Sequence, residues 1–229
     1  LYEARNYALK KAQGDFIALL DVDDWWLPDK LEKQISLFDN PDVGLVYGNL
    51  WYQIQNKKKK KILKKNILPT GKILTNLLDD YVIRTATIVI RKKCLESLKY
   101  KFNDNFHIIG DYDLNLRIAA EWHIECVQSP IAFVRIHGQN ETILKKEKQI
   151  EEFKIWYNKM KNDKIISANE NFKKIPLKIN YIETMHSILN DTYGKKFLRV
   201  YKYPFSLDKI KLISALLLPK FILRIMRGY

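Results

Sequence analysis

The fold is decided by the stretch Phe16-Ile17-Ala18-Leu19-Leu20-Asp21-Val22-Asp23-Asp24-Trp25-Trp26, in which five apolar residues run directly into three carboxylates within four positions. A short apolar run that ends abruptly in polar residues predicts a buried strand. Open α/β sheets bind ligands beyond the carboxyl ends of their strands, which is where these acids lie. Asp21 and Asp23 alternate along an extended backbone, so both can face one site. Because three acids this close repel each other, we expect them to bind Mg²⁺ or Mn²⁺.

A simpler interpretation remains open for part of this stretch. Asp24 stands a few residues before Pro28, which is a typical first-turn residue of a helix, so Asp24 could act only as a helix cap. Capping requires one acid, however, and the stretch supplies three. The sequence therefore favours a ligand site over a cap alone.

Length and composition indicate a globular protein of ordinary type. The chain has 229 residues, of which 47% are hydrophobic and 29% charged, which suggests one domain with or without an appendage. Its two cysteines, Cys94 and Cys126, have no metal-binding or redox spacing, so we expect a reduced, cytosolic protein. The sequence begins with Leu1 rather than Met and shows no signal peptide, so we interpret it as a fragment.

The net charge of +14 invites a comparison with nucleic-acid-binding proteins, but the positive charge is confined to two segments. Residues 56–66 carry seven lysines and no acid, and residues 195–229 carry nine Lys or Arg against Asp208 alone. The rest of the chain is nearly neutral. We therefore predict no nucleic-acid partner. The lysine run is either a solvated hairpin loop or a contact with anionic lipid.

Hydrophobic spacing predicts alternating helices and strands through residue 142, with Leu31, Ile35 and Phe38 on the inward face of one helix. The expected helices are 2–12, 28–38, 72–81, 92–98 and 110–120. The expected strands are 16–20, 43–46, 49–54, 85–90, 123–127 and 131–136. This alternation indicates an α/β fold, a Rossmann-like mixed sheet flanked by helices.

Residues 143–229 are predicted to form a helical C-terminal extension, and we place the domain boundary between 142 and 143. Its last segment, 206–229, has apolar residues at spacings of three or four with Lys and Arg between them. The uncharged run 212–219 is too short to span a bilayer. A basic amphipathic segment on a membrane surface fits this pattern, and a helix that closes the core or packs on a partner chain is the alternative.

An ordered set of motifs resembles the family 2 glycosyltransferases with the GT-A fold. It comprises Ala4-Arg5-Asn6, the apolar strand with Asp21-x-Asp23-Asp24, and Trp26-Leu27-Pro28-x-Lys30-Leu31-Glu32. Asp111-Tyr112-Asp113-Leu114 with Arg117 is similar to the family's acceptor-side motif, and Arg135-x-His137 followed by Thr142 to its closing segment. The resemblance covers residues 3–142.

The resemblance implies inverting, metal-dependent transfer of a sugar from a nucleotide donor, with UDP-sugars expected, to a hydroxyl of a saccharide or lipid-linked acceptor. It implies that Asp23, Asp21 and His137 hold Mn²⁺ or Mg²⁺ and that Asp21, Asp24 and Arg5 contact the donor. Asp111 would be the base that deprotonates the acceptor, as a single displacement requires. For Asp111 a helix N-cap, and for His137 a structural hydrogen bond, remain the alternatives.

Two features depart from the family. Many members carry Glu directly before the base, where this chain has Gly110. The family also opens with a strand, a helix and a second strand that bind the nucleobase, and no such segment stands before Leu1. We therefore expect this chain alone to bind UDP poorly.

Three functions are compatible with the sequence. We expect a glycosyltransferase of surface polysaccharide or glycolipid biosynthesis, peripheral at the cytoplasmic face of the membrane. A truncated or inactive remnant that binds nucleotide-sugar or membrane is the main alternative. A metal-dependent phosphohydrolase or nucleotidyltransferase is less consistent with only four histidines. The sequence indicates no oligomeric state.

Overall fold

A computed structural model describes residues 1–54, 60–190 and 195–219. The strands are β1 Phe16–Ala18, β2 Trp25–Trp26, β3 Val43–Ile54, β4 Lys60–Ile62, β5 Val89–Arg91 and β6 His123–Ile136. The α-helices are α1 Tyr2–Lys11, α2 Lys30–Ile35, α3 Leu74–Asp79, α4 Lys92–Ser97, α5 Gly110–Glu121, α6 Glu141–Leu144, α7 Lys146–Met160, α8 Ile175–Asn190, α9 Lys195–Lys202 and α10 Leu207–Leu217. Short 3₁₀ helices are η1 Ser36–Phe38, η2 Thr85–Thr87 and η3 Phe172–Lys174.

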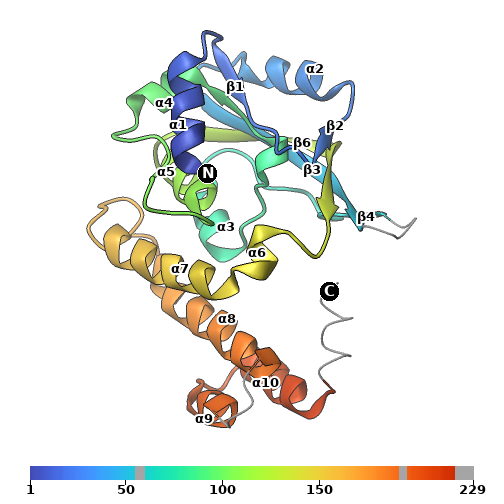
Figure 1. Ribbon diagram of the computed structural model, residues 1–229. Coiled ribbons are helices and arrows are strands. Elements are labelled where there is room, and N and C mark those ends of the chain that lie inside the picture. Colours follow the sequence, from blue (N-terminus) through green and yellow to red (C-terminus); the bar gives the residue numbers. More distant parts are fainter. Residues whose placement is uncertain (55–59, 191–194, 220–229) are drawn as a thin grey trace.

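The strands form one mixed sheet in the order β1-β5-β3-β6-β2, with β4 paired to β3 (Figure 1). Only the long pairing of β3 with β6 is parallel, and the other neighbours are antiparallel. Pro130 lies within β6 opposite Asn49, where the register shifts, because proline cannot donate to a regular ladder. The predicted mixed sheet flanked by helices is confirmed.

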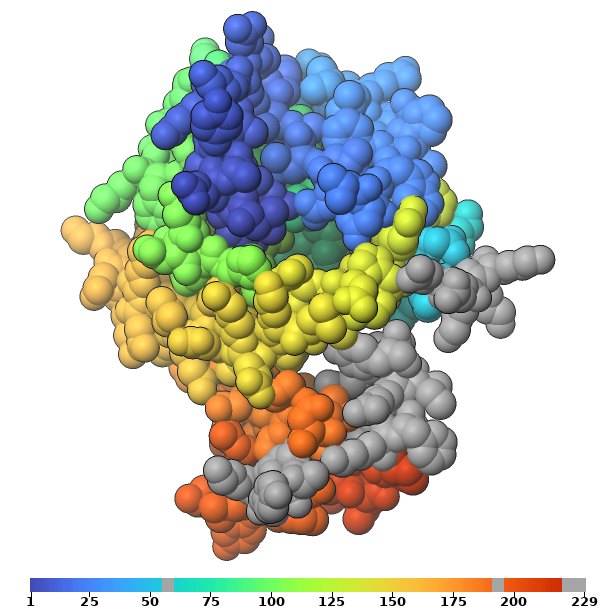
Figure 2. Space-filling view, in the orientation of Figure 1, coloured from blue at the N-terminus to red at the C-terminus, as the bar shows by residue number. Residues whose placement is uncertain are grey.

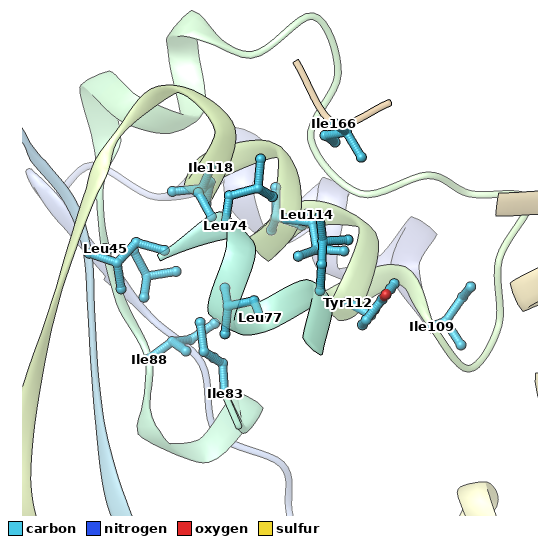
Figure 3. Close-up of a cluster of buried hydrophobic side chains, with 14 of the residues drawn as sticks. Leu45, Leu74, Leu77, Ile83, Ile88, Ile109, Tyr112, Leu114, Ile118 and Ile166 are labelled. Carbon is cyan, nitrogen blue, oxygen red and sulfur yellow. The ribbon is translucent and has the colours of Figure 1, made fainter. Parts of the chain in front are cut away.

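Helices cover both faces of the sheet. Val43 and Val46 of β3 pack with Phe38 on the face covered by α2 and η1, whereas Leu45 and Tyr47 point into the main core on the other face. Strand residues alternate between faces, so a strand buried on both sides is apolar throughout. Figure 3 shows the main core, where Leu74 and Leu77 of α3 meet side chains of α5 and β3.

The main core continues beyond residue 142. Trp156 and Met160 of α7, together with Phe172 and Ile179, belong to the same buried cluster as the sheet residues. A separate, smaller cluster forms between the end of α8, α9 and α10. The division into 1–142 and 143–229 therefore does not separate two cores, because α7 completes the first one.

Three predictions about local structure are wrong. Residues 85–87 form the 3₁₀ helix η2, so the strand predicted over 85–90 shrinks to β5. Segments 43–46 and 49–54 are one strand, as are 123–127 and 131–136. In α2, Leu31 and Ile35 are exposed, whereas Lys30 and Gln34 are buried.

Candidate functional site

The acidic stretch forms a tight turn between two edges of the sheet. The backbone N–H of Asp24 donates to the carbonyl of Asp21 at 3.1 Å, which closes the turn after β1. The next two residues form β2 and pair with β6, so the turn is anchored by a strand more than 100 residues away in sequence. The apolar run is shorter as a strand than predicted, because Leu19 and Leu20 lie outside β1 and Leu20 is exposed.

Arg5 and Asp21 form an ion pair in the turn. Nη2 of Arg5 lies 2.5 Å from Oδ1 of Asp21, and the arginine side chain is 12% exposed against 42% for the aspartate. The guanidinium also lies over the rings of Tyr2 and Phe102, 5.4 and 5.7 Å from their centroids. The aromatic contacts fix the direction in which this cation points. A half-exposed carboxylate and a fixed guanidinium are thus presented side by side.

Asp23 faces His137. Its Oδ2 lies 2.9 Å from Nε2 of the imidazole, and both side chains are only partly buried. The backbone N–H of Gln139 donates to Nδ1 of the same ring at 3.2 Å. With Nδ1 accepting this N–H, Nε2 can carry the ring proton and donate a hydrogen bond to the Asp23 carboxylate. The carboxylate and the imidazole therefore lie side by side and are partly open to solvent.

Asp24 points to the other side of the turn and accepts the backbone N–H of Arg135 at 3.0 Å. Burial raises the pKa of the Asp24 carboxyl to about 6, and the negative charges of Asp23 and Asp21 add to the rise, while the hydrogen bond opposes it. Asp24 therefore holds β6 against the turn. Ionising this buried carboxyl costs free energy, and the cost is larger when Asp23 and Asp21 are also ionised.

Asp111 lies in the first turn of α5 and binds two hydroxyls. Tyr2 Oη lies 3.3 Å from Oδ1, and Thr85 Oγ1 donates to Oδ2 at 3.2 Å. The alternative role as helix cap is wrong, because the α5 cap position is Ile109 and makes no side-chain cap bond. Instead the buried carboxylate of Glu152, from α7, accepts the backbone N–H groups of residues 107, 108 and 109.

Tyr2 connects the acidic turn to Asp111. Its ring contacts Arg5, and its hydroxyl, besides meeting the Asp111 carboxylate, accepts the Asp111 backbone N–H at 3.3 Å and lies 3.1 Å from the carbonyl of Ile108. A Cβ added to Gly110 would lie only 2.5–2.7 Å from this ring. The glycine that departs from the family pattern therefore makes room for Tyr2.

The proposed metal ligands do not gather into one cluster. Over residues 1–54, 60–190 and 195–219, no group of three or more His, Cys, Asp or Glu side chains is placed to hold a metal ion. Asp23 and His137 are together, whereas Asp21 faces Arg5. A hollow of about 500 Å³ beside α1 and α4 is lined by other residues, among them Asn6, Lys92 and Phe102.

Sequence reasoning missed Tyr2, Thr85 and Glu152. Each acts through a partner 26 to 109 positions away, and no local spacing signals such a contact. It also missed Arg84: burial alone would lower the pKa of its guanidinium, but Tyr52, Tyr81 and Asp111 raise it overall. A stable cation therefore lies in the electrostatic surroundings of Asp111.

The sequence is similar to known glycosyltransferases. Residues 1–99 match the profile described as Glycosyl transferase family 2. The chain is 38% identical over 124 residues to an Escherichia coli protein named UDP-Glc:alpha-D-GlcNAc-diphosphoundecaprenol beta-1,3-glucosyltransferase WfgD, with 54% of this chain and 46% of that protein covered. It is 29% identical over 123 residues to the amylovoran biosynthesis glycosyltransferase AmsB of Erwinia amylovora, covering 50% and 39%. The chain thus spans about half or less of these curated relatives.

A solved structure shares the fold. The S. aureus TarS fragment 1–349 in complex with UDP superposes with a TM-score of 0.56 at 16% identity, covering 93% of this chain and 57% of that one. At this identity the likeness concerns the fold alone. It agrees with the mixed sheet and flanking helices described above and extends into the C-terminal helices.

Proposed function

We propose that this chain is a family 2 glycosyltransferase that transfers a sugar, with inversion, from a nucleotide donor to a hydroxyl acceptor; the match of residues 1–99 to that family and the fold shared with TarS support the proposal. The observation that carries the proposal is the position of Tyr2, which touches Arg5 on the donor side and Asp111 on the acceptor side. The two halves of the site are thereby one connected unit. UDP-sugars are the proposed donors, and the name of the E. coli relative, which includes UDP-Glc, supports that choice.

On the donor side, Arg5 and Asp21 would contact the nucleotide-sugar. Asp24 supports the turn by accepting the backbone N–H of Arg135 in β6. The Arg5 guanidinium offers donors to a diphosphate, whose charge grows as the sugar leaves. Asp21 holds that guanidinium in place through the 2.5 Å ion pair. A direct contact of Asp24 with the donor remains a prediction, because its Oδ1 is occupied by the backbone of β6.

Asp23 and His137 fit a divalent cation, since a carboxylate oxygen and an imidazole nitrogen are accepted ligands of Mn²⁺ and the pair is open to solvent. A cation there would neutralise the departing diphosphate. The imidazole would bind such a cation through Nε2, the ring nitrogen that faces Asp23. Asp21, predicted as a third ligand, would have to leave Arg5 to join them.

On the acceptor side, we assign Asp111 as the general base. Its carboxylate takes the proton of the acceptor hydroxyl while the hydroxyl oxygen bonds to the anomeric carbon and the bond from that carbon to the diphosphate breaks. The hydroxyls of Tyr2 and Thr85 orient the two carboxylate oxygens. Glu152 holds the segment just before α5 by accepting the backbone N–H groups of residues 107 to 109.

The acceptor is proposed to be a saccharide or a lipid-linked saccharide of surface polysaccharide or glycolipid synthesis. The names of the relatives, one with a diphosphoundecaprenol-linked acceptor and one of amylovoran biosynthesis, support this class. A lipid-linked acceptor would place the protein peripherally on the cytoplasmic membrane face. Over the described residues, no helix is long and apolar enough to cross a bilayer.

The test is UDP release by the full-length protein that carries this sequence. The protein is incubated with a panel of UDP-sugars, Mn²⁺ and a membrane extract that contains acceptors. EDTA is then added to remove the metal. Asp23→Ala and Asp111→Asn are compared with Asp39→Asn, an exposed acid outside the site. We expect metal-dependent release that both site variants abolish and the control retains.

Other outcomes separate the alternatives. Loss in Asp23→Ala alone would keep the cation site and remove Asp111 as the base. Phosphate release from nucleotides without sugar transfer would indicate the hydrolase. No release from any donor would favour the inactive remnant.

A further inference from the structure

Helices α9 and α10 form the end of the molecule farthest from the sheet (Figure 1). They present large apolar side chains to solvent: Tyr201 is 80% exposed, Phe205 88%, Leu207 77% and Leu217 81%. Phe197, Leu198, Ile210 and Ile213 are also exposed. We call these eight residues the α9–α10 surface. Figure 2 shows this end as a protrusion below the main body.

The exposure does not reflect unpacked helices. The opposite faces of α9 and α10 are buried, since Val200, Tyr203, Leu212 and Ala215 pack against the end of α8. Ser206 caps α10 by accepting the backbone N–H of Lys209 at 3.2 Å. Both helices therefore have a packed inner face and a second apolar face that no other described residue covers.

Within α10, this outward face is the stripe that the sequence pattern predicted. Leu207, Ile210, Ile213 and Leu217 follow helical spacing, yet they point away from the protein, while Leu212 and Ala215 make the core contacts. The remainder of the predicted stripe, beyond residue 219, lies outside the described residues. Soluble proteins seldom expose so many large apolar side chains together unless the surface binds something.

Positive charge surrounds the same surface. Residues 195–219 contain six Lys or Arg and a single acid, Asp208. Arg199 pairs with Glu183 and Lys211 with Asp208. Lys202 is exposed and Lys209 half-exposed, and neither makes an ion pair among the described contacts; Nζ of Lys209 donates to the Tyr201 carbonyl at 2.9 Å. Lys and Arg chains lie along apolar surface and keep their charge at its rim. The surface thus combines apolar residues with a net positive rim.

We propose that the α9–α10 surface docks on an anionic lipid membrane. Its composition, aromatic and aliphatic chains rimmed by lysine, suits the boundary between headgroups and acyl chains. A second copy of the chain is a poorer occupant, because it would bring two positive rims together. The inference rests on this surface alone, and it supplies the membrane contact that a lipid-linked acceptor in the proposed function would require.

The experiment measures binding of the full-length protein to vesicles by co-sedimentation. Vesicles of phosphatidylcholine alone are compared with vesicles that also contain phosphatidylglycerol. We expect binding only to the anionic vesicles, and weakening as salt rises. The variant Lys202→Gln/Lys209→Gln should bind at least about tenfold more weakly than the wild type. Each basic residue near an anionic surface contributes about 1 kcal/mol, and two are removed.

An apolar variant tests the other half of the surface. Tyr201→Ser/Phe205→Ser should lower vesicle binding at least about tenfold, because both side chains would be withdrawn from the interface. Ile67→Ser/Leu144→Ser is the matched control: both residues are exposed and lie elsewhere, and its binding should stay at the wild-type level. Circular dichroism confirms that each variant is folded.

Three results would overturn the proposal: wild-type protein that ignores anionic vesicles, variants that bind as well as wild type, or an oligomer in analytical ultracentrifugation that the apolar variant dissociates. The last result would make the surface a contact between protein chains. Sugar transfer to a soluble acceptor, measured as UDP release in the same variants, should remain unchanged. Failure of docking and failure of the transferase assignment are thus read separately.

Discussion

Nε2 of His137 lies 2.9 Å from Oδ2 of Asp23, although 114 positions separate the two residues in sequence. The contact depends on β2, whose residues Trp25 and Trp26 pair with Phe133 and Ala132 of β6. The same strand pairing therefore brings the acidic turn and the segment after β6 to one corner of the sheet.

Removing either member of the Asp23–His137 pair should weaken the dependence of UDP release on Mn²⁺. We expect Asp23→Ala and His137→Ala each to raise the half-saturating Mn²⁺ concentration, on the order of 10- to 100-fold. The double variant should cost less than the sum, since both changes remove one site. His186→Ala, which removes an imidazole paired with Glu147 away from the site, is the control. An unchanged Mn²⁺ requirement in His137→Ala would assign that imidazole a structural role.

Arg5→Lys should raise the KM for the donor while leaving the protein folded. Lysine keeps the charge but loses the planar contact with the Tyr2 and Phe102 rings, which lie within 5.7 Å of the guanidinium carbon. We expect an increase of about tenfold, equivalent to one lost charge-assisted hydrogen bond. Steady-state kinetics at saturating acceptor measure it. Lys10→Arg, on the same helix, should behave as wild type; equal effects in both would reject the assignment.

Asp111→Asn should reduce kcat by about 10²- to 10⁴-fold, the usual contribution of a general base. Tyr2 and Thr85 contact different carboxylate oxygens, so asparagine can accept one hydroxyl at its carbonyl oxygen and donate its amide N–H to the other. The free energy of unfolding should therefore change little. Urea denaturation and single-turnover transfer separate the two effects. If the free energy of unfolding fell by as much as the activation free energy of transfer rose, the carboxylate would be structural.

Gly110→Ala should destabilise the protein by about 1–3 kcal/mol, because the new Cβ would overlap the ring of Tyr2. The double variant Gly110→Ala/Tyr2→Ala should show a coupling energy, since the clash disappears with the ring. Gly14→Ala is the control, as its Cβ would meet only a carbonyl oxygen at 3.5 Å. Denaturant titration of the wild type, Gly110→Ala, Tyr2→Ala, the double variant and the control measures these effects. A neutral Gly110→Ala would show that α5 can move away from Tyr2.

The Asp24 carboxyl predicts a pH dependence of stability in EDTA. Its pKa is about 6 in the folded protein and 3.8 ordinarily, so between these values folding takes up a proton and stability falls as pH rises. Above pH 6 the cost is constant. Asp24→Asn keeps the acceptor for the Arg135 N–H, so it should raise Tm at pH 7.5 and change it little at pH 4. An equal shift in Tm at both pH values would contradict the raised pKa.

Lys30 is fully buried over the Trp26 ring, and its Nζ has no hydrogen-bond partner among the described residues. Burial lowers its pKa to about 8, so the charge is costly below that pH and the cost fades as pH rises toward 10.5. Lys30→Met should stabilise the fold by about 1–3 kcal/mol at pH 7, less at pH 10. Lys33→Met, at an exposed ion pair, should not.

The sequence predicted the order and type of most elements because apolar periodicity reports burial directly. It failed at α2, where Leu31 and Ile35 follow helical spacing but are exposed, while Lys30 and Gln34 are buried. Gln34 is held there by hydrogen bonds from Nε2 to the carbonyls of Val46 and Thr87. Polar partners that satisfy a buried amide come from distant strands, so residue type alone gave the wrong face.

The sequence predicted those candidate site residues whose type and motif indicate their chemistry. It did not predict which of these residues contact one another. Asp23 and His137 were paired on resemblance, and the structure brings them together. No pattern indicated that Asp21 would face Arg5 or that Glu152 would hold the segment before α5. The roles of Asp111, Arg5 and the metal ligands stay predictions until the experiments above are done.

The parallel pairing of β3 with β6 has a consequence for the order of folding. It joins Val43 to His123 and Ile54 to Ile136, so a chain of about 80 residues must close before the central ladder forms. Non-local parallel pairing is slow, whereas local pieces such as α1 and α5 form early. His137 follows β6 directly and reaches Asp23 only once that strand has docked. The pairing of Asp23 with His137 is therefore completed only after the β3–β6 ladder has formed.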